Sequence, residues 1–128
     1  MQSQFRVLLV EDDYLTRQLL ATALQRGNLD VDVAESAWEA KRLIGRYGSQ
    51  YCCILLDLIL PDGDGADIAS HVRQTAPQIP VLAVTGGASE STVAEFGDVV
   101  RLVIRKPVDL ATLSDLILAL GNAKIPIR

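Results

Sequence analysis

The rest of the chain can be ordered around the stretch YCCILLDLILPDG, residues 51–63. It opens as an apolar, β-prone run, reaches a carboxylate at Asp57 and breaks at Pro61-Asp62-Gly63. An apolar run bounded by turn signals is typical of a strand in a parallel sheet that is covered on both faces. Ligands of such sheets bind beyond the carboxyl ends of the strands, where Asp57 would lie. Asp57 is therefore a candidate functional residue, although an aspartate that only ends the strand and hydrogen-bonds the turn would give the same pattern.

Strand and helix patterns alternate along the remaining chain. We predict further strands at 5–10, 31–34, 81–84 and 101–105, and helices at 14–26, 36–47, 64–74 and 110–120. This alternation predicts an α/β fold with a doubly wound, five-stranded parallel sheet and helices on both faces, in the flavodoxin-like order 2-1-3-4-5. The helical pattern is weak between 89 and 100, which predicts a short or irregular fourth helix. The inward face of the first helix is predicted from its spacing as Leu15, Leu19, Leu20, Ala23 and Leu24.

Length and composition are those of one acidic domain. The chain has 128 residues, of which 49% are hydrophobic, and we expect a single domain over 1–128 with a core at about 5–121 and a frayed tail at 122–128. A formal net charge of −4 argues against direct nucleic-acid binding. No apolar run approaches the roughly 20 residues needed to span a membrane, and the N-terminus does not resemble a signal peptide. With Cys52 and Cys53 adjacent in a buried strand, we expect reduced thiols in a cytoplasmic protein.

Polar residues end four of the five predicted strands. They are Glu11 and Asp12 on the first strand, Asp57 on the third, Thr85 on the fourth and Lys106 on the fifth. In the order 2-1-3-4-5 these four strands are contiguous, so we expect one acidic pocket with a hydroxyl and an ammonium group on its rim.

The charges of this pocket predict its chemistry. Two carboxylates about 4 Å apart repel by roughly 4 kcal/mol at an effective dielectric constant near 20. A hard divalent cation would offset this repulsion, and Mg²⁺ prefers carboxylate oxygens and bridges to phosphate. No His or Cys accompanies the carboxylates, so zinc and copper are not expected. Asp57 could then act as a nucleophile and form an aspartyl-phosphate.

From residue 5 to about 121 the sequence closely resembles the receiver domain of two-component response regulators. The matching positions are Glu11 and Asp12 for the acidic pair, Asp57 for the phosphoacceptor, Thr85 for the switch hydroxyl and Lys106, before Pro107, for the invariant lysine. The resemblance implies Mg²⁺ as cofactor, with the backbone carbonyl of Ile59 as a further ligand and Asp13 peripheral. It implies a phosphorylatable switch, not an enzyme, that accepts phosphate from a histidine kinase or histidine phosphotransfer protein and changes its surface for an unknown downstream protein.

Two departures and two rival functions accompany this resemblance. Val103 occupies the position where the family usually has an aromatic switch residue, and segment 86–100 lacks the expected amphipathic helix. An aspartate-nucleophile phosphatase of the haloacid-dehalogenase type remains an alternative, as does a degenerate receiver that only binds a partner. Two other residues are expected to be unrelated to function: His71 as a surface side chain and Trp38 as a packing residue.

Overall fold

A computed structural model describes residues 5–57, 59–60, 63–86, 100–105 and 109–124. In chain order its elements are β1 (Arg6–Val10), α1 (Tyr14–Arg26), β2 (Asp30–Ala34), α2 (Ala37–Tyr47), the short 3-10 helix η1 (Gly48–Gln50), β3 (Tyr51–Asp57), β4 (Ile59–Leu60), β5 (Gly63–Asp64), α3 (Gly65–Thr75), β6 (Val81–Thr85), β7 (Val100–Arg105) and α5 (Leu110–Lys124). The alternation of strands and helices is the one predicted from the sequence.

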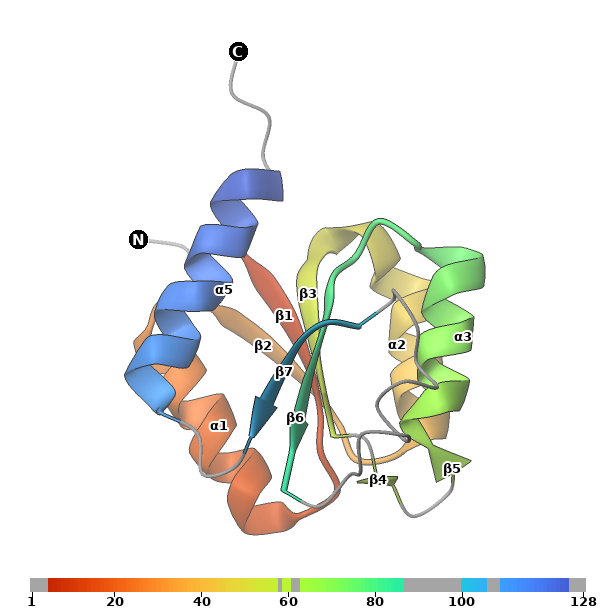
Figure 1. The fold of residues 1–128 in the computed structure, drawn as a ribbon, viewed down its shortest axis with the longest axis horizontal. Coiled ribbons are helices and arrows are strands. Elements are labelled where there is room, and N and C mark those ends of the chain that lie inside the picture. The colour runs from red at the N-terminus through yellow and green to blue at the C-terminus, as the bar shows by residue number, and fades with distance from the viewer. Residues whose placement is uncertain (1–4, 58, 61–62, 87–99, 106–108, 125–128) are drawn as a thin grey trace.

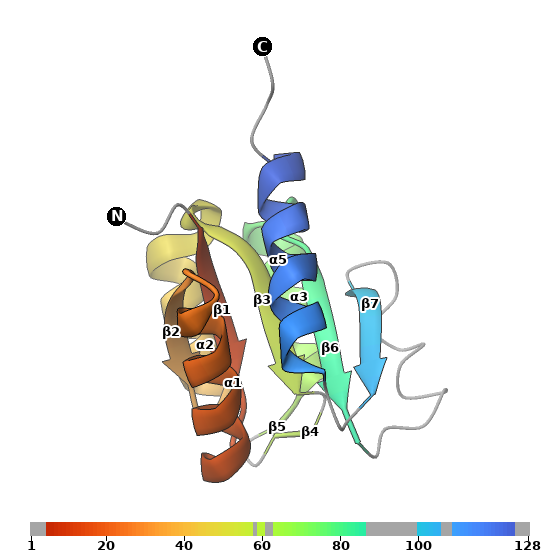
Figure 2. The same ribbon diagram turned by 90° about the vertical axis from the view of Figure 1, so that its left-hand side faces the viewer.

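The strands β2-β1-β3-β6-β7 form one parallel sheet in that order (Figure 1). Since β6 and β7 are the fourth and fifth strands of this sheet, the predicted flavodoxin-like order 2-1-3-4-5 is confirmed. Helices α1 and α5 cover one face and α2 and α3 cover the other, as the two views show (Figures 1 and 2). The strands β4 and β5 pair separately as a small antiparallel hairpin beyond the end of β3, which the sequence did not predict.

Side chains of the central strands alternate between two buried clusters. Leu8, Ile54 and Leu56 pack in the cluster that includes α2 and α3 residues. Val7 and Leu55 pack in the cluster that includes α1 and α5 residues. The period of two residues follows from the pleat of a β-strand, and it explains why β3 is apolar on both faces.

The two cysteines interrupt this alternation. Cys52 and Cys53 are consecutive, yet both pack in the cluster shared with α1 and α5, where the pairing register between β1 and β3 shifts near Arg6. Both are buried and neither forms a disulfide, as predicted. Regular alternation would place consecutive residues on opposite faces, but one irregular residue in a ladder changes the face of its neighbour.

The inward face of α1 differs from the predicted one. Leu20, Ala21 and Leu24 are buried, whereas Leu15 and Leu19 are 70% and 63% exposed. Helical spacing fixes which residues share a face but leaves the rotation of the whole set undetermined when apolar residues cover more than one stripe.

Two other expectations are wrong. Trp38 does not pack in the core, because it is 68% exposed on α2. The last helix continues through Gly121 to Lys124, so residues 122–124 belong to α5 and not to a frayed tail. A single glycine inside a helix costs only about 1 kcal/mol relative to alanine and does not by itself end it.

The predicted fourth helix falls almost entirely on 87–99, outside the described residues. Within the described ranges, no helix combines the length and apolar character that a membrane crossing demands.

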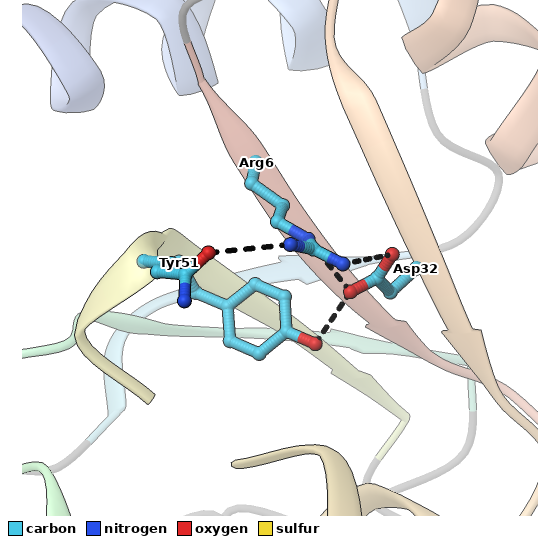
Figure 3. Close-up of polar contacts among 4 residues, drawn as sticks. Arg6, Asp32 and Tyr51 are labelled. Carbon is cyan, nitrogen blue, oxygen red and sulfur yellow. Dashed lines mark hydrogen bonds and ion pairs between the residues drawn. The ribbon is translucent and has the colours of Figure 1, made fainter. Parts of the chain in front are cut away.

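A polar network joins three strands at the end of the sheet where β1 begins (Figure 3). The Arg6 guanidinium donates to both carboxylate oxygens of Asp32, at 2.8 and 3.2 Å, and the Tyr51 hydroxyl donates to Asp32 at 2.7 Å. The guanidinium also lies 4.0 Å from the centre of the Tyr47 ring, within cation–π range. Because Tyr51 is fully buried, its hydroxyl needs this carboxylate as its partner.

Replacing Tyr51 with phenylalanine tests this network. Tyr51→Phe should lower the free energy of unfolding by about 1 kcal/mol, because a hydrogen bond to a charged acceptor is lost. Tyr14→Phe is the matched control, since the Tyr14 hydroxyl accepts an exposed bond from Gln18 on a ring that is 60% exposed. Urea unfolding should show a change below about 0.5 kcal/mol for the control. Equal effects of the two changes would mean that the network adds nothing.

The same variant should show a specific pH dependence. Burial, followed by the hydrogen bond and the charge of Asp32, raises the pKa of Tyr51 above its usual value. The unfolded state loses this proton near pH 10 while the folded state keeps it, so the Tyr51 contribution is complete below pH 10 and is lost as pH rises further. The destabilisation caused by Tyr51→Phe should therefore shrink above pH 10. A constant difference across that range would contradict the assignment.

Candidate functional site

Three carboxylates meet at the carboxyl end of the sheet. Val10 of β1 pairs with Leu56 of β3, so the next residues, Glu11 and Asp57, follow neighbouring strands at the same level. Oxygen atoms of Glu11, Asp12 and Asp57 all lie within 4.8 Å of one another. Glu11 is buried, Asp57 is half-buried and Asp12 is exposed. The cluster therefore has a closed side at Glu11 and an open side toward solvent.

Backbone contacts fix the loop that carries Glu11 and Asp12. The Glu11 amide donates to the carbonyl of Ala34 at 3.0 Å, which extends the β1–β2 ladder into the site. Asp13 caps α1 by accepting from the amide and hydroxyl of Thr16, at 2.8 and 2.7 Å. The Asp13 amide in turn donates to a carboxylate oxygen of Glu11 at 3.2 Å. Asp13 thus orients its neighbours, and it is not among the clustered carboxylates.

Arg17 was not identified from the sequence, although it supports this loop. One nitrogen of its guanidinium donates to the carbonyls of Glu11 and Asp12, at 3.1 and 3.2 Å. The other pairs with Glu35 at 2.9 Å. The Arg17 side chain is only 11% exposed, which is unusual for an arginine on a surface helix. Its position one turn after the Asp13 cap was the available signal, but a single arginine at helical spacing normally indicates a solvated face.

Of the other predicted site residues, the structure describes the strand positions of Thr85 and Ile59. Thr85 ends β6 one residue after Val84, which pairs with Asp57, so its backbone lies on the strand next to that of Asp57. Thr85 also pairs with Arg105, the residue before Lys106. Lys106 itself lies outside the described residues. Ile59 begins the β4–β5 hairpin, two positions after Asp57.

The donor set fits a hard divalent cation. All three ligand groups are carboxylates, and within the described residues this is the one group of acidic or metal-binding side chains close enough to share an ion. Oxygen-only ligands of this kind suit Mg²⁺, which binds through one or two carboxylates and keeps several waters. Burial of Glu11 adds to the need for a positive charge, because a carboxylate removed from water is costly unless it is compensated.

An apolar groove lies along α1, the helix that follows the acidic loop. It has a volume of about 520 Å³ and is lined by Leu15, Gln18, Leu19, Thr22, Ala23, Arg26 and, from α5, Leu110. The exposed leucines Leu15 and Leu19 form its apolar wall. The sequence had assigned both to the core.

His71 of α3 is half-buried, so the expectation of a plain surface histidine is wrong. Its Nε2 atom is buried and has no hydrogen-bond partner among the described residues.

Val103 lies in β7, opposite Ala83 of β6, and is partly buried against the cluster shared with α2 and α3. The position thus holds a short β-branched side chain that has few rotamers.

Comparison with known proteins identifies relatives over nearly the whole chain. The family model of the response regulator receiver domain matches residues 7–118. Response regulator protein PilR of Pseudomonas aeruginosa is 34% identical over 116 residues, which is 90% of this chain and 26% of PilR. The chain therefore spans about a quarter of that relative.

Solved structures agree with this relationship. The receiver domain of HemR from Leptospira biflexa superposes with a TM-score of 0.79 at 29% identity, covering 97% of this chain and 99% of that one. A receiver domain protein from Clostridium thermocellum reaches a TM-score of 0.86 at 22% identity, covering 94% and 96% of the two chains. The second likeness supports the fold alone.

Replacement of Asp57 tests the electrostatics of the carboxylate cluster. Without metal, Asp57→Asn should raise the free energy of unfolding by about 1 kcal/mol, because it removes repulsion with Glu11 and Asp12. Mg²⁺ should raise the melting temperature of the unmodified protein by linkage, and should do so less for the variant. Asp115→Asn on the exposed face of α5 is the matched control. Destabilisation by Asp57→Asn in the absence of metal would refute the picture of clustered charge.

Proposed function

Because the chain belongs to the response regulator receiver domain family of two-component systems, we propose that it is a phosphorylatable switch with Asp57 as the phosphoacceptor. The observation that carries this proposal is the cluster of Glu11, Asp12 and Asp57 within 4.8 Å. Glu11 is enclosed and Asp12 is exposed, whereas Asp57 is half-buried at the end of the central strand and matches the position of the family's phosphoacceptor.

The proposed reaction is a transfer between two side chains. A carboxylate oxygen of Asp57 attacks the phosphorus of a phosphohistidine; the new P–O bond forms as the P–N bond breaks, and the imidazole leaves and takes up a proton. Hydrolysis of the acyl phosphate later restores the carboxylate. Mg²⁺, held by Glu11, Asp12, Asp57 and the Ile59 carbonyl, would offset negative charge on the transferred group. The Thr85 hydroxyl and the Lys106 ammonium are proposed to hold phosphoryl oxygens.

The proposal extends to partners and location. The donor would be a histidine kinase or a histidine phosphotransfer protein, and a downstream protein would recognise the altered surface. We propose one receiver domain with its core over about 5–121, working in the cytoplasm. The two cysteines, which form no disulfide, support a reducing compartment, since thiols persist there. Because Val103 stands in place of an aromatic side chain, phosphorylation would change the partner-binding surface without rotation of an aromatic ring.

The donor is proposed to dock on the α1 groove. This groove runs along the helix that follows the acidic loop, and the cap of that helix, Asp13, is bonded to Glu11. Its wall exposes Leu15 and Leu19, and apolar side chains in such positions contribute most when a partner excludes water from them. A docked donor would thus be held beside Asp57 without taking part in its chemistry.

Incubation with acetyl phosphate and Mg²⁺ tests the phosphoacceptor. Intact mass should show one added phosphoryl group, and Asp57→Asn should take up none. Asp115→Asn should be labelled as the unmodified protein is. Full labelling of Asp57→Asn would place the nucleophile elsewhere, and absence of labelling in every protein would favour a degenerate receiver that only binds. Sustained turnover of a generic phosphate ester would favour the phosphatase alternative.

Replacement of Leu19 separates docking from chemistry. With the histidine kinase that labels the unmodified protein fastest, Leu19→Ala should slow phosphotransfer roughly tenfold, a loss of about 1.4 kcal/mol of contact. Labelling by acetyl phosphate should not change, because a small donor needs no groove. Leu102→Ala removes another exposed leucine, on β7, and should leave both rates as they are. If Leu102→Ala slows kinase transfer while Leu19→Ala does not, the donor docks elsewhere.

A further inference from the structure

The outer face of α2 carries an exposed aromatic ring beside a cation. Trp38 is 68% exposed, and the Arg42 guanidinium lies 5.8 Å from the centre of its ring. The two residues are one helical turn apart, so they form a single surface feature. Exposed tryptophan and arginine side chains are the types that dominate the energy of protein interfaces.

Positive charge is concentrated on this helix. α2 holds Lys41, Arg42 and Arg46 against one acidic residue, Glu39, a net charge of +2 within a chain of net charge −4. In the described part of the chain, none of the three cations has an ion-pair partner, whereas Arg6 and Arg17 are both paired. The remainder of the chain therefore carries −6, and α2 is a basic strip on an acidic molecule.

Gly45 lies on the same outer face, seven residues after Trp38. It is exposed, and a Cβ built on it would meet no atom within 4 Å, so packing inside the molecule does not require a glycine. Glycine inside a helix costs roughly 0.5–1 kcal/mol relative to alanine. A helix that accepts this cost without internal need has a position where another chain can approach its backbone closely.

From these contacts we propose that the outer face of α2, defined by Trp38, Lys41, Arg42, Gly45 and Arg46, binds an acidic segment of a partner protein. An apolar side chain of the segment would cover the Trp38 ring, its carboxylates would pair with Arg42 and Arg46, and its backbone would pass over Gly45. This surface is separate from Asp57 and from the α1 groove, so its use does not depend on phosphoryl transfer.

Charge and shape argue against the other occupants. A second copy of the chain seated symmetrically on this face would bring Arg42 and Arg46 against their own equivalents. Binding to an anionic membrane would require a broad apolar stripe exposed on the helix. In α2, the apolar residues Ala40 and Ile44 are instead buried in the core. A nucleic acid would be repelled by the net charge of the whole molecule.

Trp38 is the one tryptophan of the chain, so its fluorescence reports on this face directly. The probes are synthetic peptides in which glutamate accompanies leucine, one with helical and one with alternating spacing, and the same peptides with lysine for glutamate. Titration of the unmodified protein and of Asp57→Asn should give the same saturable shift with at least one glutamate peptide, weaker at high salt. The lysine peptides should give none.

Variants of α2 give the decisive comparison, with peptide fluorescence anisotropy as the measurement. Arg42→Glu should weaken binding roughly tenfold or more, and Arg101→Glu, the same charge change at an exposed position of β7, should leave it unchanged. Gly45→Ala should raise the urea midpoint and yet weaken binding. If Gly45 had only a structural role, Gly45→Ala would change the urea midpoint without weakening peptide binding.

Three results would overturn the proposal. The first is the absence of saturable binding by any glutamate peptide, and the second is full binding by both Arg42→Glu and Gly45→Ala. The third is a Trp38 shift produced by phosphatidylserine vesicles or by self-association of the protein, without a shift from the peptides. Since the Asp57→Asn protein is measured in parallel, failure here leaves the phosphoacceptor assignment unaffected.

Discussion

A strand that is apolar on both faces is stable only between two covering layers, and β3 imposes this constraint on the whole chain. Its side chains enter both buried clusters, so helices must lie on each side of the sheet. Parallel neighbours joined by crossover helices satisfy that requirement, and they also bring all carboxyl ends of the strands to one edge. Asp57 ends β3 in the middle of the sheet, and β1 pairs with β3 so that Glu11 follows at the same level. The packing demand of one strand thus determines where the carboxylates meet.

Holding those carboxylates together costs free energy, and the surrounding contacts show how the chain tolerates it. Repulsion of a few kcal/mol at an effective dielectric constant near 20 would spread a flexible loop apart. The loop after β1 is instead tied down by the Glu11 amide, by the Asp13 cap and by the Arg17 guanidinium on two carbonyl oxygens. None of these contacts neutralises the cluster by a direct ion pair with Arg17, whose charge is taken up by Glu35. These contacts hold the loop through its backbone, so the approach of the three carboxylates does not depend on an ion pair with Arg17.

The sheet order, the start of the second helix at Ser36 and the strand-end carboxylates could be predicted, because each depends on local pattern or on a rule of chain topology. The Asp13 cap was not predicted. The errors have a common origin in tertiary context. Leu15 and Leu19 have the right spacing for a core face, but the rotation of α1 is set by what it packs against. Gly121 is a good helix terminator only where the following chain turns away, and here α5 continues. Arg17 acts through carbonyl groups that belong to the fold and not to the sequence pattern.

The misplaced residues also indicate how the molecule divides its surface. Leu15 and Leu19 on α1 and Trp38 on α2 are large apolar side chains that the core does not use, and they lie on helices that cover opposite faces of the sheet (Figure 1). On α1 the exposed leucines adjoin the acidic loop, whereas on α2 the exposed ring is accompanied by cations for which the described residues provide no ion-pair partner. A single partner of ordinary size cannot cover two opposite faces, since a standard interface buries only about 800 Å² per protein. The proposed phosphoryl donor on α1 and the proposed acidic segment on α2 would therefore be able to occupy these faces at the same time.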